Sequence, residues 1–170
     1  MAGEDSKCTT AAGRVPWARV TTHLFQTELW LPVPRATLFP FFADARNLEV
    51  ITPSWLNFRI LTPGEIPMRA GAVIDYQLRV HGLPVRWRTE ITAWNPPSGF
   101  TDEQRRGPYR LWRHTHSFAE QNGGTLCGDR VEYAVPGGAW VNRWFVRRDV
   151  EAIFNYRAEA LKKHFTAKEN

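Results

Sequence analysis

The sequence has 170 residues, of which 43% are hydrophobic and 13% aromatic, and its formal net charge at pH 7 is +5. This length supports one domain with a substantial core and excludes a second full domain. The small positive charge mainly favours solubility. Because many arginines alternate with apolar residues, we interpret them as an exposed sheet face and expect no nucleic-acid partner.

The N-terminal segment and the cysteines favour a cytoplasmic location. Acidic residues stand where a secretory signal would be basic, and no apolar run follows them. Cys8 lies in this polar leader and Cys127 in a predicted strand, so we expect no disulfide framework. No stretch approaches the roughly 20 apolar residues of a membrane span. We therefore expect a flexible extension over residues 1–20 and a single domain over residues 21–168.

Alternating apolar and polar residues predict seven strands joined by short turns. After the first strand, at about residues 23–31, the segment PRATLFPFFADARNLEVIT predicts one or two short helices. Pro34 suits a first helical turn, Pro40 breaks or kinks a helix, and Asp44 can cap the next one. The short connections between the later strands favour hairpins and therefore an antiparallel meander. These later strands are expected at residues 56–61, 72–80, 83–94, 99–106, 109–120 and 125–135.

The period of the hydrophobic pattern changes in the C-terminal segment. Between residues 138 and 167, apolar residues recur at spacings of three and four, which predicts an amphipathic helix. At 1.5 Å per residue, such a helix is about 40 Å long and can cross an entire curved sheet. Its apolar stripe contains Val146, Val150, Ile153, Phe154, Leu161 and Phe165.

One predicted strand carries two histidines between large aromatic residues. In YRLWRHTHSF (109–118), Trp112, His114, His116 and Phe118 share one face, because successive side chains of a strand alternate. The presumed inner faces of the neighbouring strands add further polar groups, which must pair with one another, with water or with a ligand. These additional residues are Asp102, Gln104, Asp129 and Tyr133.

Arg157 lies in the apolar stripe of the predicted helix, and the sequence leaves two interpretations open. Its aliphatic stem could pack on the core while the charged group extends to solvent. Alternatively, its guanidinium points at a carboxylate of the sheet, with Asp102 or Asp129 as candidates.

The order of these elements and three stretches of sequence resemble a known superfamily. A strand, a short helix pair, an antiparallel meander and one long C-terminal helix is the order of the helix-grip fold. The stretches ITPSWLNFRI (51–60), residues 71–118 and IFNYRAEALKKHF (153–165) are similar to START-like, polyketide cyclase/dehydrase and lipid-transport proteins, the SRPBCC superfamily. The resemblance implies an α+β fold in which a curved seven-stranded antiparallel sheet wraps around the long helix. It also implies an internal hydrophobic cavity for lipids, polyketides or other small molecules.

We expect this START-like domain to bind a small hydrophobic or aromatic molecule without a cofactor. The alternative is a cofactor-independent cyclase, dehydratase or isomerase. In that case His114 or His116 acts as general base, Asp102 or Asp129 orients it, and Tyr133 or Arg157 stabilises an enolate. The expected ligand-binding residues are Tyr76, Trp87, Gln104, Trp112, Phe118, Tyr133, Ile153 and Arg157.

The histidine pair also has the spacing that zinc sites in β-sheets use, with Asp102 or Asp129 as a candidate third ligand. Such a pair alone is a weak signal, and the other histidines fall at the ends of predicted elements. The ring-hydroxylase iron ligands of the superfamily have no matching motif here. We therefore expect no metal.

The segment GGAWVNRWFVRR (137–148) places Trp140, Trp144 and Phe145 beside three arginines. Aromatic residues next to cations can dock at a bilayer interface. We favour the alternative that these aromatics plug one end of the barrel, so membrane contact is a minor expectation. The oligomeric state stays open.

Overall fold

The computed structural model of the protein describes residues 21–166, so the predicted extension over residues 1–20 lies outside the described residues. The described chain folds into one seven-stranded sheet in which every neighbouring pair is antiparallel. The spatial order of the strands is β1-β7-β6-β5-β4-β3-β2. Their bounds are β1 (His23–Leu31), β2 (Arg59–Ile60), β3 (Val73–Val80), β4 (Leu83–Asn95), β5 (Gly99–Arg106), β6 (Leu111–Gln121) and β7 (Gly124–Ala134).

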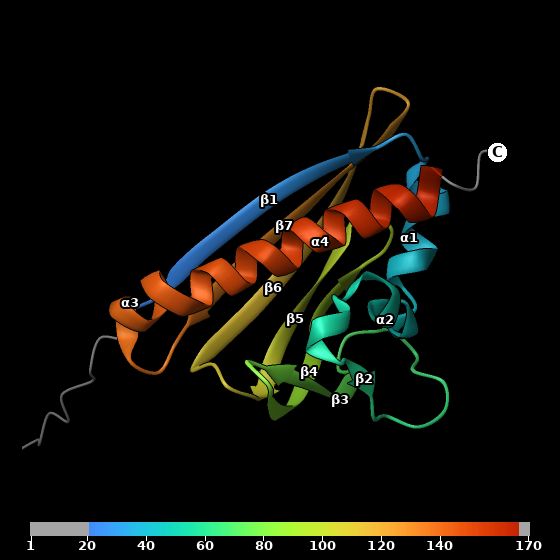
Figure 1. Ribbon diagram of the computed structural model, residues 1–170. Coiled ribbons are helices and arrows are strands. Elements are labelled where there is room, and N and C mark those ends of the chain that lie inside the picture. Colours follow the sequence, from blue (N-terminus) through green and yellow to red (C-terminus); the bar gives the residue numbers. More distant parts are fainter. Residues whose placement is uncertain (1–20, 167–170) are drawn as a thin grey trace, which may run out of the picture.

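The long helix α4 (Arg147–Thr166) runs across the sheet, and the short helices near one end of α4 lie beside the other end of the sheet (Figure 1). This arrangement confirms the predicted α+β helix-grip fold. The remaining helical segments are α1 (Arg35–Phe42), η1 (Ala45–Asn47), α2 (Leu48–Ile51), η2 (Ser54–Leu56), α3 (Gly138–Val141) and the π-helical turn η3 (Asn142–Val146).

The segment between β1 and β2 follows its local sequence signals. Pro34 precedes α1, which continues through Pro40 for two more residues. The side chain of Asp44 accepts a hydrogen bond from the backbone N–H of Arg46, so the predicted cap forms on η1. The expected strand over residues 56–61 is wrong at its start. The 3₁₀ turn η2 ends at Asn57, whose φ of 43° is left-handed, so the strand begins only at residue 59.

The predicted C-terminal helix is divided at its start by the π-helical turn η3. In this region Val141 and Val146 pack against the core cluster of β7, and Asn142 is buried. As a result, Trp140, Trp144 and Phe145 point outward and are 67%, 49% and 50% exposed. The interpretation that these aromatics plug one end of the barrel is therefore wrong.

The apolar core of the described chain is divided into three clusters of buried residues. One cluster joins α1, the end of α4 and the sheet around Phe118, and another packs Val150 and Phe154 of α4 against β7. Irregularities in the β4–β5 register lie between Arg88 and Thr89 and between Ile91 and Ala93. Beyond the second one, Trp94 packs on Phe100 with ring centroids 5.5 Å apart, although strict alternation predicts it on the outer face.

Candidate functional site

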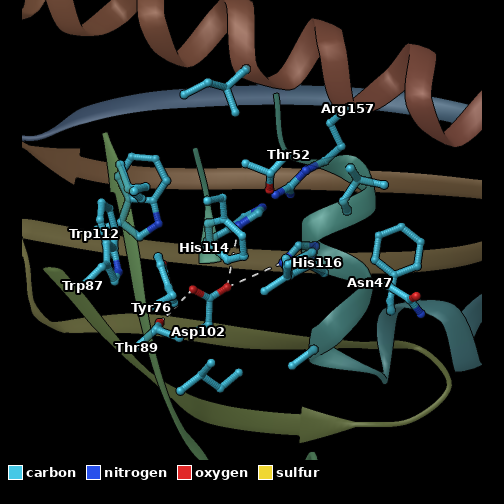
Figure 2. A pocket seen from close by; sticks show the side chains of 18 of the residues that line it. Asn47, Thr52, Tyr76, Trp87, Thr89, Asp102, Trp112, His114, His116 and Arg157 are labelled. Atoms are coloured by element: carbon cyan, nitrogen blue, oxygen red, sulfur yellow. Dashed lines mark hydrogen bonds and ion pairs between the residues drawn. The ribbon is translucent and has the colours of Figure 1, made fainter. Parts of the chain in front are cut away.

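A cavity of about 170 Å³ lies between the concave face of the sheet and α4. Strands β3, β4, β5 and β6 line it on one side, α4 on another, and the helical segment between β1 and β2 on a third. Figure 2 shows Trp87 and Trp112 at one end of the cavity and a group of charged side chains next to them, near the middle. The lining includes five of the predicted ligand-binding residues: Tyr76, Trp87, Trp112, Ile153 and Arg157.

The aromatic end of the cavity is built by β3, β4 and β6. Tyr76 and Trp87 are directly opposite each other on β3 and β4, and their rings are stacked with centroids 5.8 Å apart. Trp112 meets Trp87 edge-on at 5.4 Å. Burial raises the pKa of the Tyr76 hydroxyl well above its ordinary value, so this end of the cavity carries no charge at neutral pH.

The charged cluster in the cavity follows from strand register. On β6, His114 and His116 share one face, Asp102 of β5 lies directly opposite His114, and Asp129 of β7 lies directly opposite His116. Directly opposite residues of antiparallel strands bring their side chains together. Antiparallel pairing therefore brings together the four residues that sequence analysis named as candidate catalytic groups.

Asp129 contacts both imidazole rings through one oxygen. Its Oδ1 lies 2.8 Å from His114 Nε2 and 3.0 Å from His116 Nδ1. Asp102 lies on the other side of the rings: its Oδ2 is 3.6 Å from His114 Nδ1 and 3.5 Å from His116 Nε2. The other oxygen of Asp102 accepts a hydrogen bond of 3.0 Å from the Thr89 hydroxyl. Figure 2 shows Asp102 facing both rings.

The proton affinities in this cluster are coupled. Burial alone would raise the pKa of Asp129, but hydrogen bonds from His114 and His116 hold it well below its usual value. The pKa of Asp102 is lowered in the same way, against burial, chiefly by His116. Burial and the nearby ring of His116 lower the pKa of His114. In His116 burial is outweighed by Asp102 and Asp129, and its pKa is raised.

Arg157 reaches into this cluster from α4. Its guanidinium lies over the ring of Phe154 at 5.0 Å, and Nη1 is 3.9 Å from Asp129 Oδ1. The side chain is only 11% exposed, so the structure favours the carboxylate-facing interpretation over extension to solvent. Its buried Nε and Nη1 have no hydrogen-bond partner among the described residues.

Three predicted ligand-binding residues lie outside the lining of the cavity. Gln104 bridges the β5–β6 connection, where its side-chain amide donates to the carbonyl of Tyr109 at 2.7 Å. Phe118 packs against Phe39 and Phe42 in the neighbouring core. Tyr133 is 2% exposed and packs beside Trp112, with which it shares the core between the sheet and α4.

The sequence analysis did not assign roles to several lining residues. Thr89 could have been found, because it shares a strand face with Trp87, and Phe154 was assigned only to the apolar stripe of the helix. Asn47 and Thr52 also line the cavity. They come from the irregular helical segment, where no periodic pattern indicates which side chains face inward.

The cyclase, dehydratase or isomerase hypothesis stays a prediction. Its four candidate residues lie in one cluster, with Asp102, His114 and His116 at the cavity surface and Asp129 behind the rings. Of its two candidate enolate-stabilising groups, Arg157 lines the cavity and Tyr133 does not.

The fold and the cavity define the class: a helix-grip protein with a largely apolar cavity between the sheet and the long helix. A family model described as polyketide cyclase / dehydrase and lipid transport matches residues 31–162. The chain belongs to this family, which confirms the predicted superfamily. Family membership fits a protein that binds small hydrophobic molecules.

Solved structures show the same fold at low sequence identity. Ara h 8.0201 is 16% identical, with a TM-score of 0.64 over 86% of this chain and 99% of that chain. Protein Ms6760 from Mycobacterium smegmatis is 19% identical, with a TM-score of 0.63 over 88% and 93%. Protein CV1439 from Chromobacterium violaceum is 12% identical, with a TM-score of 0.67 over 84% and 96%. No curated protein matches the sequence.

Two further expectations concern the surroundings of the protein. Within residues 21–166, no helix has both the length and the apolar character needed to cross a bilayer. Cys127 is a free thiol buried in β7, whereas Cys8 lies outside the described residues. A cytoplasmic location stays a prediction.

Proposed function

We propose that the protein binds a compact hydrophobic or aromatic molecule in the cavity between the sheet and α4. The observation that carries this proposal is the combination of a cavity of about 170 Å³ with walls formed by Tyr76, Trp87 and Trp112. An engineered apolar protein cavity of about 150 Å³ binds benzene, so one or two fused rings match the space better than a long acyl chain.

The polar atoms of the lining indicate which group the molecule carries. Trp87 Nε1 and Arg157 Nε are buried donors that lack hydrogen-bond partners among the described residues. A buried polar atom without a partner costs free energy, which a ligand oxygen would recover. We therefore expect an aromatic ligand with a hydroxyl or carbonyl oxygen, such as a phenol or a polyketide-like ring.

Native mass spectrometry first checks whether a ligand co-purifies with the protein. Isothermal titration calorimetry with 2-naphthol then tests the proposal. Ile153→Trp places a large ring in the cavity, whereas Asn155→Trp places the same ring on the exposed side of α4. We expect binding that Ile153→Trp weakens at least tenfold and Asn155→Trp leaves unchanged. Equal binding by both variants would locate the probe elsewhere and contradict the proposal.

A second candidate function is contact with an anionic bilayer, favoured by the exposed aromatics of α3 and η3. Trp140, Trp144 and Phe145 lie beside Arg143, Arg147 and Arg148 on the surface. This combination of rings and cations is typical of segments that lie in a membrane interface. The occupant we propose is a lipid surface with phosphatidylserine-like charge.

Co-sedimentation with vesicles of phosphatidylcholine and phosphatidylserine tests the bilayer contact. We expect Trp140→Ser with Trp144→Ser to abolish sedimentation. Trp30→Ser is the control, because Trp30 is also exposed (44%) but lies in β1. No sedimentation of the wild type, or equal sedimentation of all variants, would contradict this candidate.

A further inference from the structure

Three atoms that can bind a metal ion lie close together in the charged cluster of the cavity. Asp129 Oδ1 faces one nitrogen of each ring, His114 Nε2 and His116 Nδ1, and these nitrogens donate to it when the rings are neutral. The remaining nitrogens then carry lone pairs, since a neutral imidazole has one donor and one acceptor. Both of them face Asp102 Oδ2. A cation between these three acceptors would satisfy all of them at once.

The separations of these atoms fit a metal ion better than a direct hydrogen bond. Asp102 Oδ2 is 3.6 Å from His114 Nδ1 and 3.5 Å from His116 Nε2, and all three atoms lie within 4.8 Å of one another. A hydrogen bond between an imidazolium and a carboxylate is shorter, at about 2.7–2.9 Å. Bonds of about 2.0–2.2 Å to a tetrahedral ion place neighbouring ligand atoms about 3.4 Å apart.

The surrounding residues hold these atoms in place. Asp129 orients both rings from behind, as an outer carboxylate does for metal-bound histidines. Thr89 donates to the other oxygen of Asp102 and so leaves Oδ2 free. Phe100 stacks on the His116 ring with centroids 4.2 Å apart, and Phe154 meets the His114 ring edge-on at 5.3 Å.

The charge of the cluster also favours a cation. With both rings neutral, as they must be to bind a metal, Asp102 and Asp129 supply two negative charges and Arg157 supplies one positive charge, so the ion enters a cluster with a net charge of about minus one. Buried charge is unfavourable unless it is paired. A divalent ion would reverse the sign to one positive charge, which an oxygen donor from the cavity would then meet.

We propose that Asp102, His114 and His116 bind one divalent first-row transition-metal ion, with open coordination positions that face the cavity. Two imidazoles select ions such as Zn²⁺, Co²⁺ or Fe²⁺ over Mg²⁺ and Ca²⁺, which prefer oxygen ligands. The sequence analysis named this pair of histidines with Asp102 or Asp129 as a candidate ligand set but expected no metal, because a histidine pair alone is a weak signal. The ligand atoms belong to this chain alone, so the proposal does not depend on the identity of the cavity's ligand.

Calorimetric titration of chelator-treated full-length protein with ZnCl₂ tests the site, and titration with CoCl₂ adds a visible absorption spectrum. We expect one ion per chain and cobalt bands typical of nitrogen and oxygen ligands. Asp102→Asn removes the ligand charge at nearly constant volume and should weaken zinc binding by about 100-fold or more. Asp129→Asn removes the orienting carboxylate and should weaken it by about 10–100-fold.

His81→Ala is the matched control, because His81 also contacts a carboxylate, that of Asp149 at 2.8 Å, but lies on the surface. It should leave zinc binding unchanged. Circular dichroism checks that each variant is folded, and His116→Gln replaces Asp102→Asn if the latter does not fold. Failure of the wild type to bind zinc, or binding that survives the loss of Asp102 or His116, would overturn the proposal.

The metal and ligand proposals are separated by titrating 2-naphthol into the protein with the chelator still present. If the protein binds 2-naphthol in this titration but does not bind zinc in the metal titration, the ligand proposal stands and the metal site is rejected. Zinc binding without binding of the probe would do the reverse.

Discussion

Strands β5, β6 and β7 carry a group of charged residues on each face. On the convex face, Glu103, Arg113 and Glu132 lie directly opposite one another across the three strands, and Arg113 is paired with both glutamates. On the concave face, Asp102 lies directly opposite His114, and His116 lies directly opposite Asp129. Asp102 and His114 are next to Glu103 and Arg113 in their strands, yet the concave group faces the cavity and the convex row faces solvent.

The convex row and the concave group differ in how far water reaches their side chains. The side chain of Arg113 is 48% exposed, so water screens its ion pairs and their loss is partly replaced by hydration. The side chains of His114 and His116 are 6% and 7% exposed, and each depends on the other members of the cluster for charge compensation. Contacts of similar length on the two faces should therefore contribute very different free energies to folding. Measurements of the stability of variants can test this.

Removal of Asp129 should have the largest effect. Asp129→Ala leaves both histidines and Arg157 without their shared carboxylate inside the protein, which we expect to cost about 3–5 kcal/mol. Glu132→Ala on the convex face of the same strand should cost about 1 kcal/mol or less. Urea denaturation followed by circular dichroism measures both, and equal losses would remove the contrast between the rows.

The tryptophans allow the same comparison between buried and exposed positions. Trp87 is 7% exposed and packs on Tyr76 and Trp112, so Trp87→Ala should cost about 3 kcal/mol. Trp140 is 67% exposed, so Trp140→Ala should change stability by no more than about 0.5 kcal/mol. A large loss for Trp140→Ala in thermal melts would restore the interpretation that this residue plugs the barrel.

A single hydroxyl provides a finer test. Thr89→Val keeps the side-chain volume but removes the donor to Asp102 Oδ1, and we expect a loss of about 1–2 kcal/mol. Thr101→Val is the control on the convex face, where the hydroxyl lies 3.1 Å from that of Thr115, and we expect a loss of about 0.5 kcal/mol. If Thr101→Val loses as much unfolding free energy as Thr89→Val in chemical denaturation, the Thr89 hydroxyl has no special role in orienting Asp102.

The smallest effect is expected at Arg105, which forms ion pairs with Glu90 and Glu103 on the convex face. Arg105→Ala should cost no more than about 0.5 kcal/mol at low salt, because exposed ion pairs contribute little. In about 1 M NaCl, where the Debye length is about 3 Å, wild type and variant should unfold at the same urea concentration. A loss that persists in salt would show that Arg105 stabilises the sheet by packing.

Much of the fold could be predicted because its signals are local. Alternation defines strand faces, proline and glycine define turns, and three-and-four spacing defines a helix, so the sheet, its hairpins and the long helix were expected correctly. The errors arose where backbone geometry departs from the ideal period. The π-helical turn changed which side of residues 140–145 faces the core, and the irregular β4–β5 register brought Trp94 inward.

The candidate site was predictable as a set of residues but not as an arrangement. Strand alternation placed His114, His116, Asp102 and Asp129 on presumed inner faces, and the structure agrees because the faces did not slip at these positions. Strand alternation could not indicate that the side chain of Gln104 bonds to the backbone of Tyr109 or that Tyr133 is enclosed in the core. Those outcomes depend on the side chains that surround each residue.

By itself, the sequence determined the fold class and the presence of polar groups inside an apolar sheet, because strand and helix periods are properties of neighbouring residues. Only the tertiary structure decided that one oxygen of Asp129 serves both imidazoles, that Asp102 faces their other nitrogens, and that Arg157 turns inward. The physical reason is that these contacts join four separate elements, β5, β6, β7 and α4. Their distances are set by strand register and by the packing of α4 across the sheet.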